Sequence, residues 1–150
     1  MKLKIVNIEE ADLKDVRVAL PNTGSVLRRG NFEWTAFPVE TVFKTNRLIS
    51  GLLEGWHRMI EFDTVEYHDD AENFLFFEGV SLMLFCDREG DRLLPESMQL
   101  VRIMPGTQVE VKAGKCHYVP IPETDRFRAY VVTPLQESIL IPLAESVVAE

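Results

Sequence analysis

The chain has 150 residues, of which 46% are hydrophobic and 27% are charged, and its formal net charge is -8. This length and composition are typical of one folded domain and exclude a disordered or fibrous protein. The acidic balance repels phosphate backbones and anionic lipid headgroups, so we expect neither a nucleic acid nor a membrane as the partner. No linker, repeat or low-complexity tract divides the sequence, which predicts a single domain over residues 1–150.

The N-terminus and the cysteines favour a cytoplasmic protein. The opening MKLKIVNIEEADLK reaches acidic residues at once, so it lacks the apolar core of a signal peptide. No apolar run approaches the length of a membrane span. Cys86 and Cys116 are the only cysteines and lack CxxC spacing, which favours two buried or half-buried thiols, with a single bridge as the open alternative.

Strand signals dominate the chain. Short runs rich in β-branched and aromatic residues are separated by Gly, Pro, Asp and Asn, a spacing typical of a sandwich or barrel. The runs are KLKIV, FEWTAFPVE, HRMIEF, TVEYH, NFLFFEG, SLMLFCD, MQLVRIM, TQVEVKA, RFRAYVVT and ESILIPL. Helical periodicity is weak: IEEADLKDV is a candidate for one short helix, and ETVFKTNRLISGLLEGW is predicted as strand because Gly51 and Gly55 interrupt it.

The stretch VEYHDDAENFLFFEG crowds polar side chains ahead of an apolar run. In a strand, Glu66 and His68 point to the same side. Residues 69–71 form a predicted turn, Glu72 begins the next strand, and Gly79 ends it. If the two strands form a hairpin, then Glu66, His68 and Glu72 share one inner face near a barrel mouth.

The stretch PGTQVEVKAGKCHYVP supplies a second polar position. Gly106 opens a strand that alternates polar and apolar residues, and Gly114 makes a turn. His117 follows on the next short segment. Two of the three histidines of the chain therefore flank predicted turns.

These two stretches resemble the motifs of the cupins, small double-stranded β-helix (jelly-roll) barrels with a metal or small-molecule site inside. The first cupin motif reads His-x-His, three or four residues, Glu, six residues, Gly, and is matched by Glu66, His68, Glu72 and Gly79. The second reads Gly, five residues, Pro-x-Gly, two residues, His, and is matched by Gly106, Lys112, Gly114 and His117. The resemblance covers about residues 61–142 and implies an all-β, double-stranded β-helix fold with little helix.

The resemblance also implies a metal site. Its ligands are Glu66, His68, Glu72 and His117, a set that suits a divalent transition metal such as Mn, Fe, Ni or Zn. The chain departs from the family at Glu66, which replaces the first histidine, at Lys112, which replaces proline, and at Ile60, which replaces a leading glycine. The alternatives are solvated or backbone-bonded side chains, or a metal-free cluster with shifted pKa values that does acid–base work.

Four further residues are candidates for substrate binding. Arg128 and Tyr130 share one face of RFRAYVVT and would hold a substrate carboxylate if that face lines the barrel mouth; otherwise the face is solvated. Arg58 is another cationic candidate. Tyr118 follows His117 and either lines the pocket or packs outside it. His57, the third histidine, is predicted to be structural or at the surface.

Several functions fit these residues. The first is a metal-dependent cupin enzyme, a lyase or isomerase among others, in which Glu72 or Glu66 moves a proton of a small polar organic acid or sugar-derived molecule. A special case is suggested by HDDAENFLFFEG and VRIMPGTQVEVKAGKCHYVPIP, which are similar to the ureidoglycolate lyase branch, although the second histidine of that branch is Tyr118 here. The two remaining alternatives are a barrel that binds a small molecule without catalysis and a barrel that has only a structural role.

The resemblance to cupins also implies a homodimer, because such barrels commonly pair through sheet faces or exchanged N-terminal strands. In this chain KLKIV and FEWTAF are the segments expected to take part.

Overall fold

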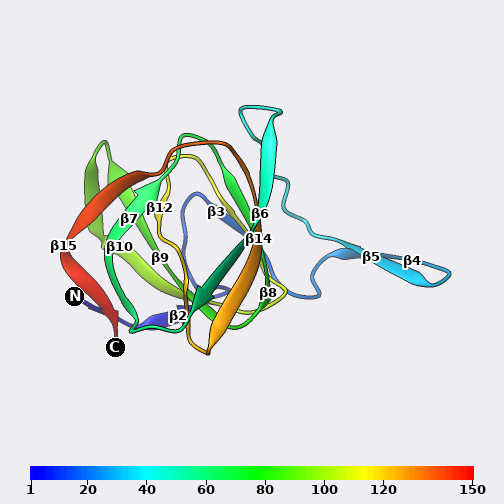
Figure 1. Ribbon diagram of the computed structural model, residues 1–150, viewed down its shortest axis with the longest axis horizontal. Coiled ribbons are helices and arrows are strands. Elements are labelled where there is room, and N and C mark those ends of the chain that lie inside the picture. Colours follow the sequence, from blue (N-terminus) through cyan, green and yellow to red (C-terminus); the bar gives the residue numbers. More distant parts are fainter.

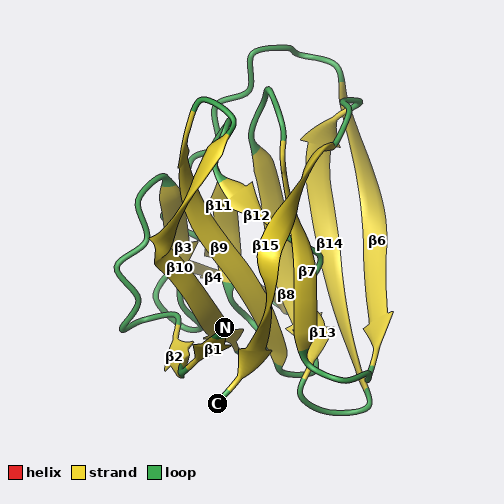
Figure 2. Cartoon of the chain, turned by 90° about the vertical axis from the view of Figure 1, so that its left-hand side faces the viewer, coloured by secondary structure: helices red, strands yellow, loops and turns green.

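The computed structural model describes residues 1–150 and consists of fifteen β-strands in three sheets, with no helix (Figures 1 and 2). The predicted all-β class is therefore confirmed. The eight-stranded sheet contains, in order, β1 (Lys2–Leu3), β15 (Ile139–Ala149), β7 (Glu61–Tyr67), β12 (Cys116–His117), β9 (Ser81–Glu89), β10 (Arg92–Ile103) and β2 (Ile5–Asn7), with β13 (Ile121–Pro122) paired to β9. The five-stranded sheet contains β3 (Val16–Ala19), β11 (Gln108–Val111), β8 (Glu72–Glu78), β14 (Arg126–Pro134) and β6 (Leu48–Trp56). A separate hairpin contains β4 (Ser25–Arg29) and β5 (Phe32–Ala36).

The N-terminal segment makes the eight-stranded sheet nearly closed. Leu3 pairs in parallel with Ala149 of β15, while Ile5, two residues later, pairs in parallel with Leu100 of β10. One short segment therefore holds both ends of the sheet, and the N- and C-terminal residues lie side by side (Figure 2). The apolar interior of this curled sheet contains Phe62, Val65, Tyr67, Leu82, Leu84, Cys86, Leu100, Cys116, Ile121 and Val147.

A second apolar core fills the space between the eight-stranded and five-stranded sheets. Strand β9 serves both cores, because Leu82 and Leu84 face the curled interior while Met83 and Phe85 face the five-stranded sheet. This is why SLMLFC is a continuous apolar run and does not alternate with polar residues. The second core contains Ile8, Phe74, Phe76, Met83, Phe85, Val101, Ile103, Val109, Val111, Phe127 and Ala129.

The turn at residues 69–71 joins the two sheets and does not close a hairpin. Strand β7 pairs with β12 and β15, whereas β8 pairs with β11 and β14. The buried Asp70 carboxylate fixes the corner by accepting hydrogen bonds from the backbone N–H groups of Lys44 and Ala71. The predicted hairpin is therefore wrong, although the corner still brings the ends of the two strands together.

Two other local predictions have mixed outcomes. The short helix predicted for residues 8–16 is wrong: residues 8–10 form a turn, and Ile8 is buried in the second core. A segment of this length does not sustain a helix alone, so packing decides its conformation. The strand predicted in ETVFKTNRLISGLLEGW is present only as β6. Gly55 is needed there because a Cβ atom would meet the ring of Phe127 on the adjacent strand.

The two thiols are buried and free, as predicted. Cys86 and Cys116 lie opposite one another on β9 and β12. Burial raises the pKa of Cys116 to about 11, which keeps this thiol protonated and unreactive. The structure contains no helix long and apolar enough to cross a bilayer.

Candidate metal centre

Four polar side chains meet at one end of the space between the two sheets. Glu66 of β7 lies opposite His117 of β12, His68 follows the end of β7, and Glu72 begins β8. All four line one cavity, so the inward orientation expected for Glu66 and His68 is confirmed. The two histidines are nearly inaccessible, with side chains 7% and 3% exposed, and Glu72 is 13% exposed.

Both imidazoles face the same carboxylate oxygen. Glu72 Oε2 lies 3.0 Å from His117 Nε2 and 3.2 Å from His68 Nε2. The two ring centroids are 5.4 Å apart. The spacing of the two sequence motifs therefore does bring their polar residues together, as predicted.

Main-chain carbonyls determine which imidazole nitrogen faces the cavity. His68 Nδ1 lies 2.9 Å from the carbonyl oxygen of Glu137, and His117 Nδ1 lies 3.0 Å from that of Lys115. A carbonyl only accepts, so each Nδ1–H donates and each Nε2 is directed into the site. Histidines that bind metals are commonly oriented in this way.

The contacts between Glu72 and the two imidazoles shift the pKa values of His68 and Glu72 in opposite directions. Burial alone would lower the pKa of His68, but the Glu72 carboxylate and the Glu137 carbonyl outweigh it and raise this pKa to about 9. Burial would raise the pKa of Glu72, but hydrogen bonds from His117 and His68 outweigh it and lower this pKa to about 2. At neutral pH without metal, His68 and Glu72 therefore form a buried ion pair.

Three of the four residues form a compact donor set. Ligating atoms of Glu66, His68 and His117 all lie within 4.8 Å of one another. Two ligand atoms that each lie about 2.0–2.2 Å from one ion are at most about 4.4 Å apart, which is close to that separation. Two imidazoles and one carboxylate are a set found around zinc and non-haem iron. The protein thus has a buried Glu/His/His triad that could bind a metal, with Glu72 on the same side of both imidazoles.

The cavity beside this triad is small and mostly apolar on its other walls. Its volume is about 290 Å³, at the lower end of the range for ligand pockets. Tyr118 lines it, as one alternative expected, and Ser138 adds a second hydroxyl. The remaining lining residues are Gly51, Leu52, Leu53, Phe74, Met83, Val119, Pro120 and Val131. No lysine or arginine is among them.

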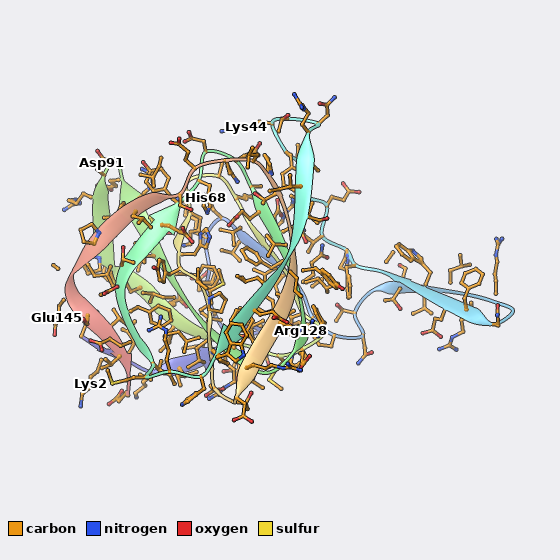
Figure 3. All side chains as sticks on the ribbon, in the orientation of Figure 1. Lys2, Lys44, His68, Asp91, Arg128 and Glu145 are labelled. Atoms are coloured by element: carbon orange, nitrogen blue, oxygen red, sulfur yellow. The ribbon has the colours of Figure 1, made fainter.

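Arg128 and Tyr130 do not reach this cavity. The inner face of β14 carries Phe127, Ala129 and Val131, so alternation turns Arg128 and Tyr130 outward. Figure 3 shows His68 and Arg128 in different parts of the fold.

Other contacts hold these outward side chains. Arg128 Nε lies 2.6 Å from Glu54, as an ion pair and not as an aligned hydrogen bond, and Tyr130 stacks on Phe77 with ring centroids 4.8 Å apart. Arg58 is exposed and donates to the carbonyl of Glu61, and it is not among the residues that line the cavity. His57 is exposed, and its Nδ1 lies 3.1 Å from the carbonyl oxygen of Pro122.

Two contributors from the loop before β15 carry no recognisable signal in the sequence. Glu137 orients His68 through its main chain, which every residue type possesses, and Ser138 lines the cavity outside any motif. Gln136 holds this loop by accepting a hydrogen bond from the Asp70 N–H and donating to Thr133.

Comparison of the sequence with protein-family models gave no match, and neither did comparison with curated proteins. The fold and the site define the class: an all-β barrel protein with a buried Glu/His/His triad suited to a metal ion.

Proposed function

We propose that this protein is a cupin-type, metal-dependent enzyme that acts on a small polar organic molecule. The observation that carries the proposal is the Glu66, His68 and His117 triad at the wall of an internal cavity, with both Nε2 atoms turned toward it. Polar residues of this kind, buried next to an apolar cavity, are the usual arrangement of a ligand or active site.

The strand order supports the cupin assignment. If β6 to β12 and β14 are lettered B to I, the five-stranded sheet contains G-D-I-B and the eight-stranded sheet contains C-H-E-F. This order supports a jelly roll, a fold that is built from two Greek keys. Gly79, the final residue of the first motif, has φ +75° and lies against the main chain of Arg126. A side chain at this position would collide with that main chain, which explains why the motif has a glycine here.

The residues divide into metal ligands and a proton carrier. Glu66, His68 and His117 would hold a divalent metal, which would act there as a Lewis acid on a ligand oxygen. Glu72 is not needed to complete this triad, and its carboxylate lies at the same cavity wall. We therefore assign to Glu72 the transfer of a proton to or from the bound molecule, since a general base must lie within hydrogen-bond reach of its proton.

The cavity favours an uncharged substrate. It has two carboxylates and no lysine or arginine, and the His68 imidazolium is already paired with Glu72, so an organic acid would find no free cationic side chain for its own carboxylate. A volume of about 290 Å³ admits only a small molecule, with its polar end toward the triad and its apolar part against Phe74 and Met83. A hydroxy-carbonyl or sugar-derived compound fits better than a ureidoglycolate-like acid.

Metal content tests this proposal. Elemental mass spectrometry on untagged protein is expected to find about one transition-metal ion per chain, and none in the His68→Ala and His117→Ala variants. His57→Ala is the matched control, because His57 is exposed and outside the cavity, and it should retain the metal. Wild-type protein that stays metal-free after incubation with Mn, Fe, Ni and Zn would refute the proposal and leave a metal-free binding barrel.

A further inference from the structure

Strand β6 contains two glycines, and contacts within the protein explain only one of them. Glycine weakens the interior of a strand, so it often marks a bend, a bulge or a place where another backbone or a ligand approaches closely. At Gly55 a Cβ atom would lie 2.3 Å from the ring of Phe127, so this position requires glycine. At Gly51 the φ angle is not positive, and a Cβ atom would meet nothing within 4 Å. The fold itself therefore does not require glycine at position 51.

A side chain at position 51 would point into the cavity beside the metal triad. Gly51 lies directly opposite Val131 of β14, and residues opposite one another on neighbouring antiparallel strands share a face of the sheet. Val131 lines the cavity and packs against the second core, so the shared face is the inner one. Leu53, the next residue of β6 on this face, packs against the same core. The empty position at Gly51 is therefore part of the cavity.

A row of side chains of decreasing size crosses the inner face of the sheet from the triad to Gly51. Phe74 of β8 pairs with Val131, which pairs in turn with Gly51. The Phe74 ring lies edge-on to the imidazole of His117, with ring centroids 6.2 Å apart. Two strand spacings, about 10 Å, separate Phe74 from Gly51. Because β6 is the last strand of its sheet (Figure 2) and Gly51 is exposed, the cavity extends from the triad to this edge.

We propose that Gly51 is the specificity-determining position of the cavity, because its missing side chain leaves room for a ring-sized apolar substituent on the substrate. The inference rests on the proposed function, which places the polar end of the substrate at the triad. Apart from the four clustered residues, the cavity lining has no charged side chain, so the substituent is uncharged. The substrate class is therefore a neutral hydroxy-carbonyl compound with an aryl or branched alkyl group.

Two probes that differ only in this substituent test the proposal. Hydroxyacetone has a methyl group and 2-hydroxyacetophenone a phenyl group on the same hydroxy-carbonyl unit. NMR titration of wild-type protein, both metal-free and after loading with Zn²⁺, is expected to show tighter binding of the phenyl compound by roughly 10-fold or more, as apolar contacts in a pocket supply. Gly51→Val should remove this preference, because the new side chain fills the space, and should leave the affinity for hydroxyacetone nearly unchanged.

Ser50→Val is the matched control. Ser50 precedes Gly51 on β6, so its side chain points to the opposite face, and it does not line the cavity. The same substitution there should keep the preference for the phenyl compound. Both variants are expected to fold, because valine favours strands and position 51 is free of collisions. Thermal unfolding should give melting temperatures no lower than that of the wild type.

The outcomes separate this inference from the proposed function. Wild-type protein that takes up no zinc would refute the metal-dependent function, while the preference for the phenyl compound would still be measured on the metal-free protein. The role of Gly51 would be overturned by a wild type without this preference, with or without zinc. It would also be overturned if the preference persisted in Gly51→Val or disappeared equally in Ser50→Val.

Discussion

Glu66 and His117 lie directly opposite one another where β7 and β12 pair, so a carboxylate and an imidazole from two distant motifs face one cavity. The roles assigned to the two carboxylates follow from this geometry. Glu66 completes the donor set with His68 and His117, whereas one oxygen of Glu72 lies 3.2 Å from His68 Nε2 and 3.0 Å from His117 Nε2.

Substituting the two carboxylates should separate these roles. Glu66→Gln is expected to weaken metal binding by about 10-fold or more, because a carboxylate ligand is lost. Glu72→Gln should change metal affinity less, because the triad stays complete, while it should abolish turnover. Titration calorimetry with Mn²⁺ and Zn²⁺ measures both affinities. The reverse order of effects would make Glu72 the ligand and contradict the assignment.

The ion pair at the site should make the stability of the metal-free protein depend on pH. His68 has its pKa raised from 6.5 to about 9, so its contribution is complete below pH 6.5 and is lost as pH rises through 9. Glu72 has its pKa lowered from 4.5 to about 2, so its contribution is complete above pH 4.5 and is lost as pH falls through 2.

Urea unfolding of wild type and Glu72→Gln measures this dependence. The difference between their free energies of unfolding should be largest between pH 4.5 and 6.5 and should shrink by pH 9. A difference that does not vary with pH would show that the ion pair does not form in solution.

The loop before β15 should control metal affinity without contributing a ligand. Gln136→Ala removes the side chain that ties this loop to Asp70 and Thr133, and so loosens the Glu137 carbonyl that orients His68. Metal affinity is expected to fall by about 10-fold, as for other changes to groups that orient metal ligands. Glu137→Ala is the control, since its exposed side chain is lost while the carbonyl remains. Equal losses in both variants would argue against the carbonyl as the orienting group.

The motif glycine should be essential for folding and not for chemistry. Gly79 and Gly90 both have positive φ, but only at Gly79 would a Cβ atom collide with a neighbouring carbonyl. Gly90→Ala is expected to cost about 1 kcal/mol, the strain of the left-handed conformation alone. Gly79→Ala should cost at least about 3 kcal/mol, because the backbone of β14 must also shift. Equal losses in urea unfolding would mean that the close approach has no energetic role.

The candidate site was largely predictable because its residues fall at fixed spacings in two short stretches. The prediction assumes that β7 and β8 pair as a hairpin. In the structure the two strands belong to different sheets, and a corner joins them. Both geometries bring residue 68 close to residue 72, so the convergence survives the error in topology. The alternation of polar and apolar residues in β14 does not identify which face of the strand is buried. Both faces contain large side chains, and neither sequence motif includes a residue of β14. The sequence therefore leaves two alternatives for Arg128, the cavity or an outward face, and the structure has it on the outward face beside Glu54.

The remaining features depend on contacts between distant segments. The sequence predicts one strand in KLKIV. In the structure, Lys2 and Leu3 pair with β15, whereas the segment that begins at Ile5 pairs with β10. The sequence predicts a strand in FEWTAFPVE, and the structure leaves the side chains of Phe32 and Trp34 on that strand exposed. Neither outcome is encoded in local periodicity, since each depends on where the rest of the chain goes.

The closure of the eight-stranded sheet by residues 2–7 constrains how the protein is made. Leu3 cannot take its place beside Ala149 until the ribosome has synthesised nearly all of the 150 residues. Long-range pairings of this kind are slow to form, and until they do the sheet has open edges that can recruit other chains. During translation, the nascent chain therefore holds an unclosed barrel, and its exposure to aggregation ends only when the first strand meets the last.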